Sequence, residues 1–145
     1  MLFDVQNQLC TAQAFTGAAT VSTDSYAKQT AAQDISIGCL MAILCMPTVS
    51  AGAGSTATLE AIQADDAALT SNVQVLNTVT VAAANFTKGS KIPVPIPPGS
   101  MNKQYLGLRV TLAGGVTTVT LDAYLVPQEE IPVYKSFPKV INPAV

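Results

Sequence analysis

The residues of this sequence that could perform chemistry are few, and most of them are carboxylates. The chain has 145 residues but no histidine and no tryptophan, and Arg109 is its single arginine. Histidine is the commonest general base in enzymes, so acid–base catalysis near neutral pH lacks its usual residue here. Asp65-Asp66 and Glu129-Glu130 are adjacent carboxylate pairs, but neighbouring side chains on a strand point to opposite faces. We therefore expect no catalytic residues and no enzymatic activity.

Metal and phosphate sites have equally little support in the residue pattern. Asp65 and Asp66 could bind calcium together with loop carbonyls, since hard cations need only oxygen ligands. The alternative is a solvated turn at these residues and a solvated tail at Glu129-Glu130. The loop Gly52-Ala53-Gly54-Ser55-Thr56 superficially resembles a phosphate-binding loop, but it lacks the lysine and the helix that such a loop requires. We expect no metal, no cofactor and no small-molecule substrate.

The three cysteines do not form a zinc pattern, because no histidine accompanies them. Cys39 and Cys45 flank one apolar run, and a strand of that length separates their α-carbons by about 20 Å. A disulfide requires roughly 4.4–6.8 Å between α-carbons, so these two cannot pair within one strand. Cys10 is then the only other partner available. Buried free thiols that act as small hydrophobic side chains are the simplest interpretation.

The composition indicates a protein whose surface is covered by other protein. Hydrophobic residues make up 49% of the chain and charged residues 11%, whereas charged residues make up roughly 25% of a typical soluble domain. The longest apolar run, residues 39–46, is far shorter than the ~20 residues of a membrane-spanning helix. The net charge is −2 and the basic residues are scattered, which argues against binding nucleic acid. No signal peptide is visible at the N-terminus, so we expect synthesis in the cytoplasm without export.

Alternation of apolar and polar residues with a period of two dominates the sequence. The two clearest runs cover residues 104–112 and 117–126, with Gly114 and Gly115 between them. Two alternating runs joined by a short glycine turn predict a β-hairpin. Further strands are predicted at residues 18–28, 40–46, 56–64 and 73–81, and a short helical turn at residues 64–70.

Two of these runs carry more specific predictions. Residues 40–46 are apolar on both faces, which predicts a central strand or a strand covered by a partner. Within residues 73–81, the valines are expected to share one face of the strand: Val73, Val75, Val79 and Val81.

Prolines alternate with aliphatic residues at Pro93, Pro95 and Pro97. In an extended chain these prolines remove the backbone N–H donors from one side, whereas Ile92, Val94 and Ile96 keep theirs on the other side. Such a segment can pair along one side only, so it belongs at the edge of a sheet. It also prevents that edge from recruiting another strand. The sequence after Ile96 then predicts a turn at residues 97–100.

Six to eight short strands separated by glycine and proline predict an all-β fold. We expect an antiparallel β-sandwich, specifically a jelly roll, with extended N- and C-terminal arms. The sandwich domain is assigned to residues 1–126. From residue 127 to residue 145 the alternation stops while aromatic and proline residues continue, which is typical of an extended arm.

Several segments, taken in their order along the chain, resemble a known viral family. They are Leu2-Phe3-Asp4, Ala12-Gln13-Ala14-Phe15-Thr16, Asp34-Ile35-Ser36-Ile37-Gly38, Gln63-Ala64-Asp65-Asp66, Ile96-Pro97-Pro98-Gly99-Ser100-Met101-Asn102-Lys103-Gln104-Tyr105-Leu106-Gly107-Leu108 and Ala123-Tyr124-Leu125-Val126. With these segments the chain resembles the jelly-roll capsid cement (decoration) proteins of short-tailed bacteriophages, as found on Bordetella phage particles. It departs from that family at Cys39, where a charged residue is usual, and in a longer tail that is richer in proline.

The resemblance implies a non-enzymatic virion protein, made in the host cytoplasm, that binds the outer surface of an icosahedral phage head. Its implied partners are the major capsid protein and further copies of itself, as a homo-dimer or homo-trimer. Nucleic acid and membranes are not expected as partners. The residues expected to contact these partners lie in the two arms: Leu2, Phe3, Tyr134, Phe137, Val140 and Ile141. Packing of the same side chains onto their own domain is the alternative.

Two other functions remain open from the sequence. One is a different virion component with a β-sandwich, such as a minor capsid, head-fibre or tail protein. The other is a carbohydrate-binding β-module, for which Tyr105 and Tyr124 on the outward face of the expected hairpin would supply the aromatic platform.

Overall fold

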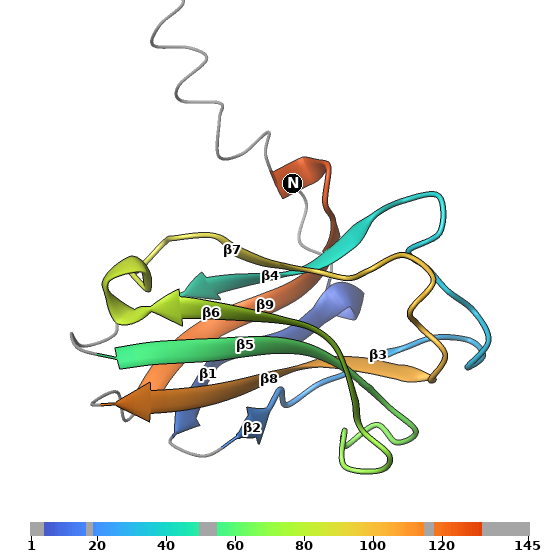
Figure 1. Ribbon diagram of the computed structural model, residues 1–145, viewed down its shortest axis with the longest axis horizontal. Helices are drawn as coiled ribbons and strands as arrows, with labels where there is room; N and C mark the ends of the chain where they lie inside the picture. The colour runs from blue at the N-terminus through green and yellow to red at the C-terminus, as the bar shows by residue number, and fades with distance from the viewer. Residues whose placement is uncertain (1–4, 17–18, 50–54, 115–117, 132–145) are drawn as a thin grey trace, which may run out of the picture.

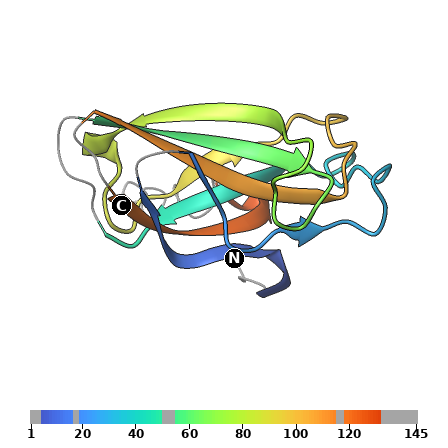
Figure 2. The ribbon, with the colours of Figure 1, turned by 90° about the horizontal axis from the view of Figure 1, so that it is seen from below.

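The structure is a computed structural model, and it describes residues 5–16, 19–49, 55–114 and 118–131. The described chain forms two antiparallel sheets that pack face to face (Figures 1 and 2). Sheet A contains, in spatial order, β1 (Gln8–Thr16), β9 (Thr118–Pro127), β4 (Met41–Pro47) and β7 (Ile92–Pro95). Sheet B contains β2 (Thr20–Val21), β8 (Tyr105–Gly114), β5 (Ser55–Ala64) and β6 (Gln74–Ala82), and β3 (Tyr26–Ala27) also pairs with β8. Two short 3₁₀ helices, η1 (Val5–Asn7) and η2 (Ala83–Asn85), complete the described elements.

The strand order confirms the predicted all-β sandwich and its jelly-roll topology. The chain crosses repeatedly from one sheet to the other, and β2 and β3 lie on the same side of β8 as one interrupted strand. Counted this way, eight strands form two sheets of four, which is the jelly-roll arrangement. The predicted arms fall almost entirely on residues 1–4 and 132–145, which lie outside the described residues.

The predicted β-hairpin is wrong, although both of its strands exist. β8 pairs with β2, β3 and β5, whereas β9 pairs with β1 and β4, so the two strands belong to different sheets. Alternation identifies which face of a strand is apolar but not which strand lies beside it. Here the apolar faces of β8 and β9 meet across the sandwich, and Leu108 and Leu121 are buried in the same core.

The core lies between the two inner sheet faces. Its largest fully buried side chains include Phe15, Phe86, Ile43, Leu59 and Leu106. Burying one such side chain contributes roughly 1.5–3 kcal/mol relative to exposure, so this layer is the main source of stability.

The proline-rich segment forms the edge strand that its sequence predicted. β7 is the outermost strand of sheet A and pairs only with β4, with Val94 opposite Ile43. The N–H of Ile96 donates to the carbonyl of Met41 at 2.9 Å, which extends the pairing beyond the strand. The turn that follows has Pro98 and Gly99 at its centre, and Gly99 has the positive φ of 79° that a type II turn requires at this position.

β4 is a central strand, as predicted, because it lies between β9 and β7. Its two apolar faces have different partners. Ile43 and Cys45 point into the main core, whereas Ala42 and Leu44 pack on the outside of sheet A with Val126 and Ile131.

The prediction that Val73, Val75, Val79 and Val81 share one face of a strand is wrong. The pairing of β5 with β6 shifts between Ala61 and Ile62, so β6 contains a β-bulge. A bulge adds one residue and reverses which side chains face inward. Leu76 therefore packs against the core while Val75 is 44% exposed.

Two weaker predictions differ in detail. The strand expected at residues 18–28 is interrupted between β2 and β3. There the side-chain hydroxyl of Ser22, in place of a backbone carbonyl, accepts the hydrogen bond from the N–H of Leu108 in β8. The helical turn expected at residues 64–70 is an irregular turn in which Leu69 has a φ of +58°.

All three cysteines are free. Cys10 and Cys45 both lie opposite Ala123, one from each neighbouring strand. Two interstrand spacings separate them by about 10 Å, which exceeds the reach of a disulfide. Burial raises the pKa of the Cys10 thiol to about 12 and also raises that of Cys45, so both behave as the expected small apolar side chains.

Candidate functional site

The six side chains predicted to contact partners lie outside the described residues. These are Leu2, Phe3, Tyr134, Phe137, Val140 and Ile141. Their role stays a prediction. The described residues instead bring polar side chains together in one group of loops and along one sheet face, and both were candidates for a functional site.

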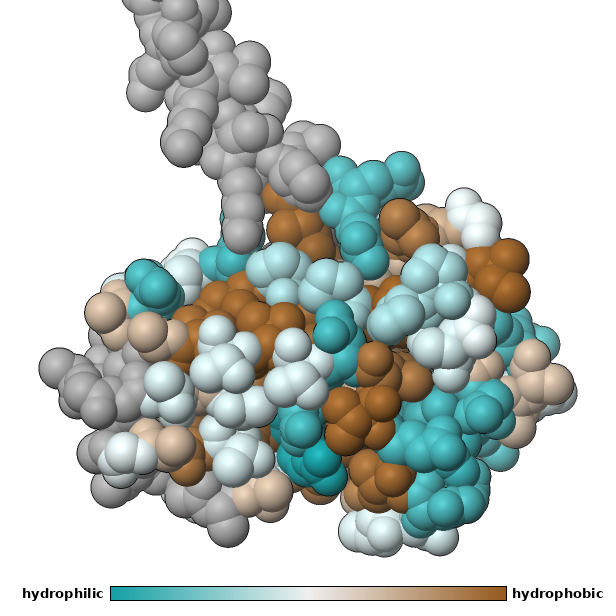
Figure 3. All heavy atoms as spheres, in the orientation of Figure 1, coloured by the Kyte–Doolittle hydropathy of each residue, from teal (hydrophilic) through white to brown (hydrophobic). Residues whose placement is uncertain are grey.

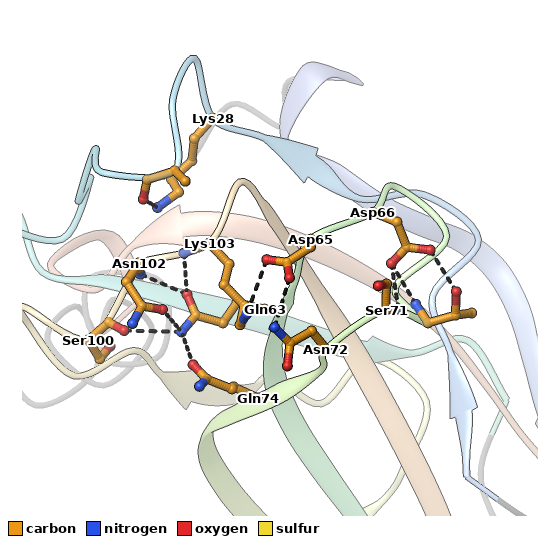
Figure 4. Close-up of polar contacts among 12 residues, drawn as sticks. Lys28, Gln63, Asp65, Asp66, Ser71, Asn72, Gln74, Ser100, Asn102 and Lys103 are labelled. Atoms are coloured by element: carbon orange, nitrogen blue, oxygen red, sulfur yellow. Dashed lines mark hydrogen bonds and ion pairs between the residues drawn. The ribbon is translucent and has the colours of Figure 1, made fainter.

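The loops 28–40, 65–73 and 96–104 meet at one end of the sandwich, and we call this region the loop cluster. Gln63, near the end of β5, lies at its centre and is only 2% exposed. Its amide nitrogen donates to Gln74 Oε1 at 3.0 Å, to Asn102 Oδ1 at 2.8 Å and to the carbonyl of Ser100 at 3.3 Å (Figure 4). Its Oε1 accepts from the N–H groups of Asn102 and Lys103 at 2.9 and 3.1 Å. One buried amide thus satisfies its own polar atoms and fixes the loop before β8.

Asp65 extends this network from the first residue after β5. Its Oδ1 lies 3.1 Å from Lys103 Nζ, and its Oδ2 accepts a hydrogen bond from Asn72 at 2.9 Å (Figure 4). The hydrogen bond from Asn72, followed by that from Lys103, lowers the pKa of Asp65 below its ordinary value. The carboxylate therefore joins two loops and stays ionised.

Asp66 closes its own turn. Its carboxylate accepts hydrogen bonds from the N–H groups of Thr70 and Ser71, each at 2.8 Å, and from the Thr70 hydroxyl at 2.6 Å. The hydroxyl bond is the main cause of the lowered pKa of Asp66. Both carboxylates considered for calcium are thus hydrogen-bonded within the loop cluster. Within the described residues, no group of three histidine, cysteine, aspartate or glutamate side chains could hold a metal ion.

Asp34 and Lys28 close the longest of these loops. Asp34 accepts hydrogen bonds from the Ser36 N–H at 2.9 Å and hydroxyl at 2.5 Å, and from the Met101 N–H at 3.3 Å. Burial on its own would raise the pKa of Asp34, but the bonds from Ser36 outweigh it and lower the pKa. Lys28 is buried and donates to the carbonyls of Ala31 and Gln33, and its burial lowers the pKa of its ammonium group.

The loop cluster is a structural network in which the polar atoms bind one another. Three of the segments noted for their viral resemblance, which contain Asp34, Gln63 and Met101, meet here. Sequence reasoning did not identify Gln63 or Lys28 as buried, because a single polar residue in a strand or loop carries no periodic signal. What the network can do is hold three loops in fixed positions.

The outer face of sheet B carries a different arrangement. Thr58 of β5 lies between Thr80 of β6 and Thr111 of β8. The next outward residue, Glu60, lies between Thr78 and Arg109. With Thr56 these residues form a surface that we call the threonine face: Thr56, Thr58, Glu60, Thr78, Thr80, Arg109 and Thr111. Its two charged groups form an ion pair, with Arg109 Nε donating to Glu60 Oε2 at 2.6 Å.

The outer face of sheet A is partly covered by the chain itself. After β9, the N–H of Gln128 donates to the carbonyl of Leu40 at 2.7 Å, and a turn follows. Ile131 then packs over Ala42, Leu44 and Val126 and is itself buried. This side of the sandwich is therefore not an open sheet surface.

Tyr105 and Tyr124 do not form a common platform, so the prediction of an aromatic sugar-binding face is wrong. Tyr105 packs on Ile62 and Leu69 outside sheet B, whereas Tyr124 packs beside Leu44 outside sheet A. The two rings lie on opposite faces of the molecule because β8 and β9 are not a hairpin.

None of the described helices is long and apolar enough to cross a membrane. No curated protein matches the sequence. The Bbp16 family, by contrast, matches residues 9–125, which run from the first buried leucine of β1 to Leu125 of β9 and so include both sheets. The chain therefore belongs to the Bbp16 family, a family of Bordetella phage proteins.

Proposed function

We propose that this protein is a capsid cement (decoration) protein, which binds the outer surface of an icosahedral phage head and holds major capsid subunits together. The observation that carries the proposal is membership of a phage protein family across the whole sandwich. Apart from Leu2-Phe3-Asp4, which lies outside the described residues, the segments that resemble cement proteins lie within that same sandwich. Three of the resembling segments meet in the loop cluster, where their polar groups form hydrogen bonds and an ion pair with one another.

The physical properties of the surface support a structural role. A cement protein must bury much of its exterior against neighbouring subunits, and burying hydroxyl and methyl groups costs less than burying charges. Only 11% of this chain is charged, and the outer face of sheet B is rich in threonine. A contact of about 1,000 Å² per copy, repeated around a closed shell, gives avidity without exceptional pairwise affinity.

The direct test uses phage heads assembled without this protein. Purified protein added to such heads should sediment with them, saturate at a copy number close to that of the major capsid protein and raise their melting temperature. The copy number separates this proposal from a minor capsid, head-fibre or tail component, which would be present in few copies. Protein that stays in the supernatant at all concentrations would refute the proposal.

The arms are the second part of the proposal. Tyr134, Phe137, Val140 and Ile141, together with Leu2 and Phe3, are proposed to contact capsid subunits or neighbouring copies. Deleting residues 132–145 keeps Ile131 on sheet A, so the sandwich should keep its melting temperature while binding to heads weakens by about tenfold, the loss expected when an apolar anchor is removed. Unchanged binding by the truncated protein would exclude the C-terminal arm from the contact.

A further inference from the structure

We propose that the threonine face of sheet B is the surface that docks onto the phage shell, against a protein surface that is flat and carries no net charge. This inference rests on the proposed cement function. It adds which side of the sandwich faces the shell and what chemistry the shell must present there.

The threonines form rows across three neighbouring strands. Thr58 pairs with Thr80 on one side and with Thr111 on the other, and the adjacent row pairs Thr56 with Ala82 and Ala113. Side chains on one face of a sheet repeat at about 4.8 Å across strands, so the rows form a regular array of methyl and hydroxyl groups. Removing water from such groups costs little free energy when a partner offers carbonyl or hydroxyl oxygens as hydrogen-bond acceptors.

The two charged side chains of this face, Glu60 and Arg109, neutralise each other. Glu60 and Arg109 are hydrogen-bonded to each other, and their side chains are only 16% and 27% exposed. A partner that placed an uncompensated charge over this pair would bury it without an ion partner, which is strongly unfavourable. The surface of the phage shell that covers the threonine face must therefore be neutral as well.

Arg109 is suited to be the anchor of the contact. Its hydrogen bond to Glu60 is made through Nε, and the guanidinium group has further N–H donors that backbone carbonyls of a partner can accept. Arginine is enriched among the residues that dominate binding energy at protein interfaces. It is also the chain's single arginine.

The two outer faces differ in how accessible they are. On sheet A, Ile131 covers Ala42 and Leu44. On sheet B, no described helix or strand lies across the threonine rows. Figure 3, which looks onto this face, shows pale, weakly polar residues around a small hydrophilic centre, with hydrophobic patches beside them. The β6 bulge adds an exposed apolar residue, Val75, beside Ile62 at one end of the face. The threonine face is thus the open and neutral surface of the described sandwich.

The test places a charge on each face in turn. Thr58→Lys and Thr80→Lys put an unpaired charge on the threonine face, and Thr80 is exposed on the edge strand β6, where lysine does not disturb folding. Thr120→Lys is the matched control, because Thr120 is a half-buried strand threonine outside sheet A, opposite Ala14. Each variant is added to heads assembled without the protein, and its melting temperature is measured separately.

We expect Thr58→Lys and Thr80→Lys to weaken binding to heads by about tenfold or more, since each buries an unpaired charge. Thr120→Lys and the neutral Thr80→Val should bind as the unaltered protein does. Folded Thr80→Lys that binds normally would overturn the inference. If the unaltered protein does not bind heads at all, the proposed function fails instead. If Thr80→Lys separates copies of the free protein but still binds heads, the face joins copies of this chain, and the inference is also overturned.

Discussion

Gly107 of β8 shows how a single residue fixes the packing on the outside of sheet B. Leu69, from the turn between β5 and β6, packs directly over Gly107, and a Cβ atom at this position would overlap the leucine side chain. Leu69 is buried and has a positive φ, so its backbone has little freedom to move away. Glycine is therefore required at residue 107 by packing rather than by a turn.

Gly107→Ala should lower the free energy of unfolding by about 1–3 kcal/mol, because the added methyl group overpacks this contact. Leu69→Ala in the same chain should remove the overlap, so the double variant should lose less stability than the sum of the two single losses. Urea denaturation of the four proteins measures this coupling. Additive losses would contradict the contact.

A second residue-scale prediction concerns pH. Hydrogen bonds from Ser36 and Met101 lower the pKa of Asp34 in the folded protein below its ordinary value of 3.8. The folded state then binds fewer protons than the unfolded state, so the stabilisation is present above the unfolded pKa and is lost as the pH falls through the folded pKa. Asp34→Asn should flatten the fall of melting temperature between about pH 5 and about pH 2. The control is Glu129→Gln, which removes an exposed carboxylate outside the loop cluster. This variant should show the same dependence of melting temperature on pH as the unaltered protein.

At the scale of elements, the edges of both sheets are closed by specific residues. On β7 the prolines leave no donors on the outer side. On β6 the side chain of Asn77, at the bulge, donates to the carbonyl of Pro95 and accepts from the N–H of Thr78, so it joins the two sheets. Gln13 of β1 joins the opposite edge in the same way, through the carbonyl of Val21 and the N–H of Thr23.

Replacing Pro93 and Pro95 with threonine should create an edge strand that can pair with a strand of another molecule. The pairing with β4 should persist, because Ile92, Val94 and Ile96 keep their donors toward that strand. The two new N–H groups would face outward, where they can pair with another molecule. We expect an unchanged melting temperature but concentration-dependent association, measured by light scattering. Pro98→Ala, in the adjoining turn, should remain as monodisperse as the unaltered protein, and equal behaviour of both variants would contradict the role of the prolines.

The sequence predicted elements better than their partners. Alternation located β8 and β9, and the alternate prolines placed β7 at an edge, because both signals depend on a single strand. Strand pairing, the bulge at Leu76 and the burial of Gln63 depend on contacts between distant segments, for which one sequence has no local pattern. The predicted aromatic platform of Tyr105 and Tyr124 is wrong for the same reason, since it needed β8 and β9 to be neighbours.

At the scale of the whole molecule, the two sides of the sandwich have different surfaces. The outer side of sheet A is partly covered by the segment that ends at Ile131, whereas the threonine rows of sheet B are open. The loop cluster closes one end with internally satisfied hydrogen bonds. A sandwich whose described residues leave a neutral face open is suited to the proposed cement function, in which each copy would occupy a fixed position in a repeating lattice.

The most direct measurement is a cryo-electron microscopy reconstruction of the assembled phage particle. The proposed function predicts density for the sandwich on the outer surface of the head, repeated with the symmetry of the shell, with the threonine face toward the major capsid protein. A reconstruction in which the head surface carries no such density, or in which the protein occurs only at the tail, would contradict it.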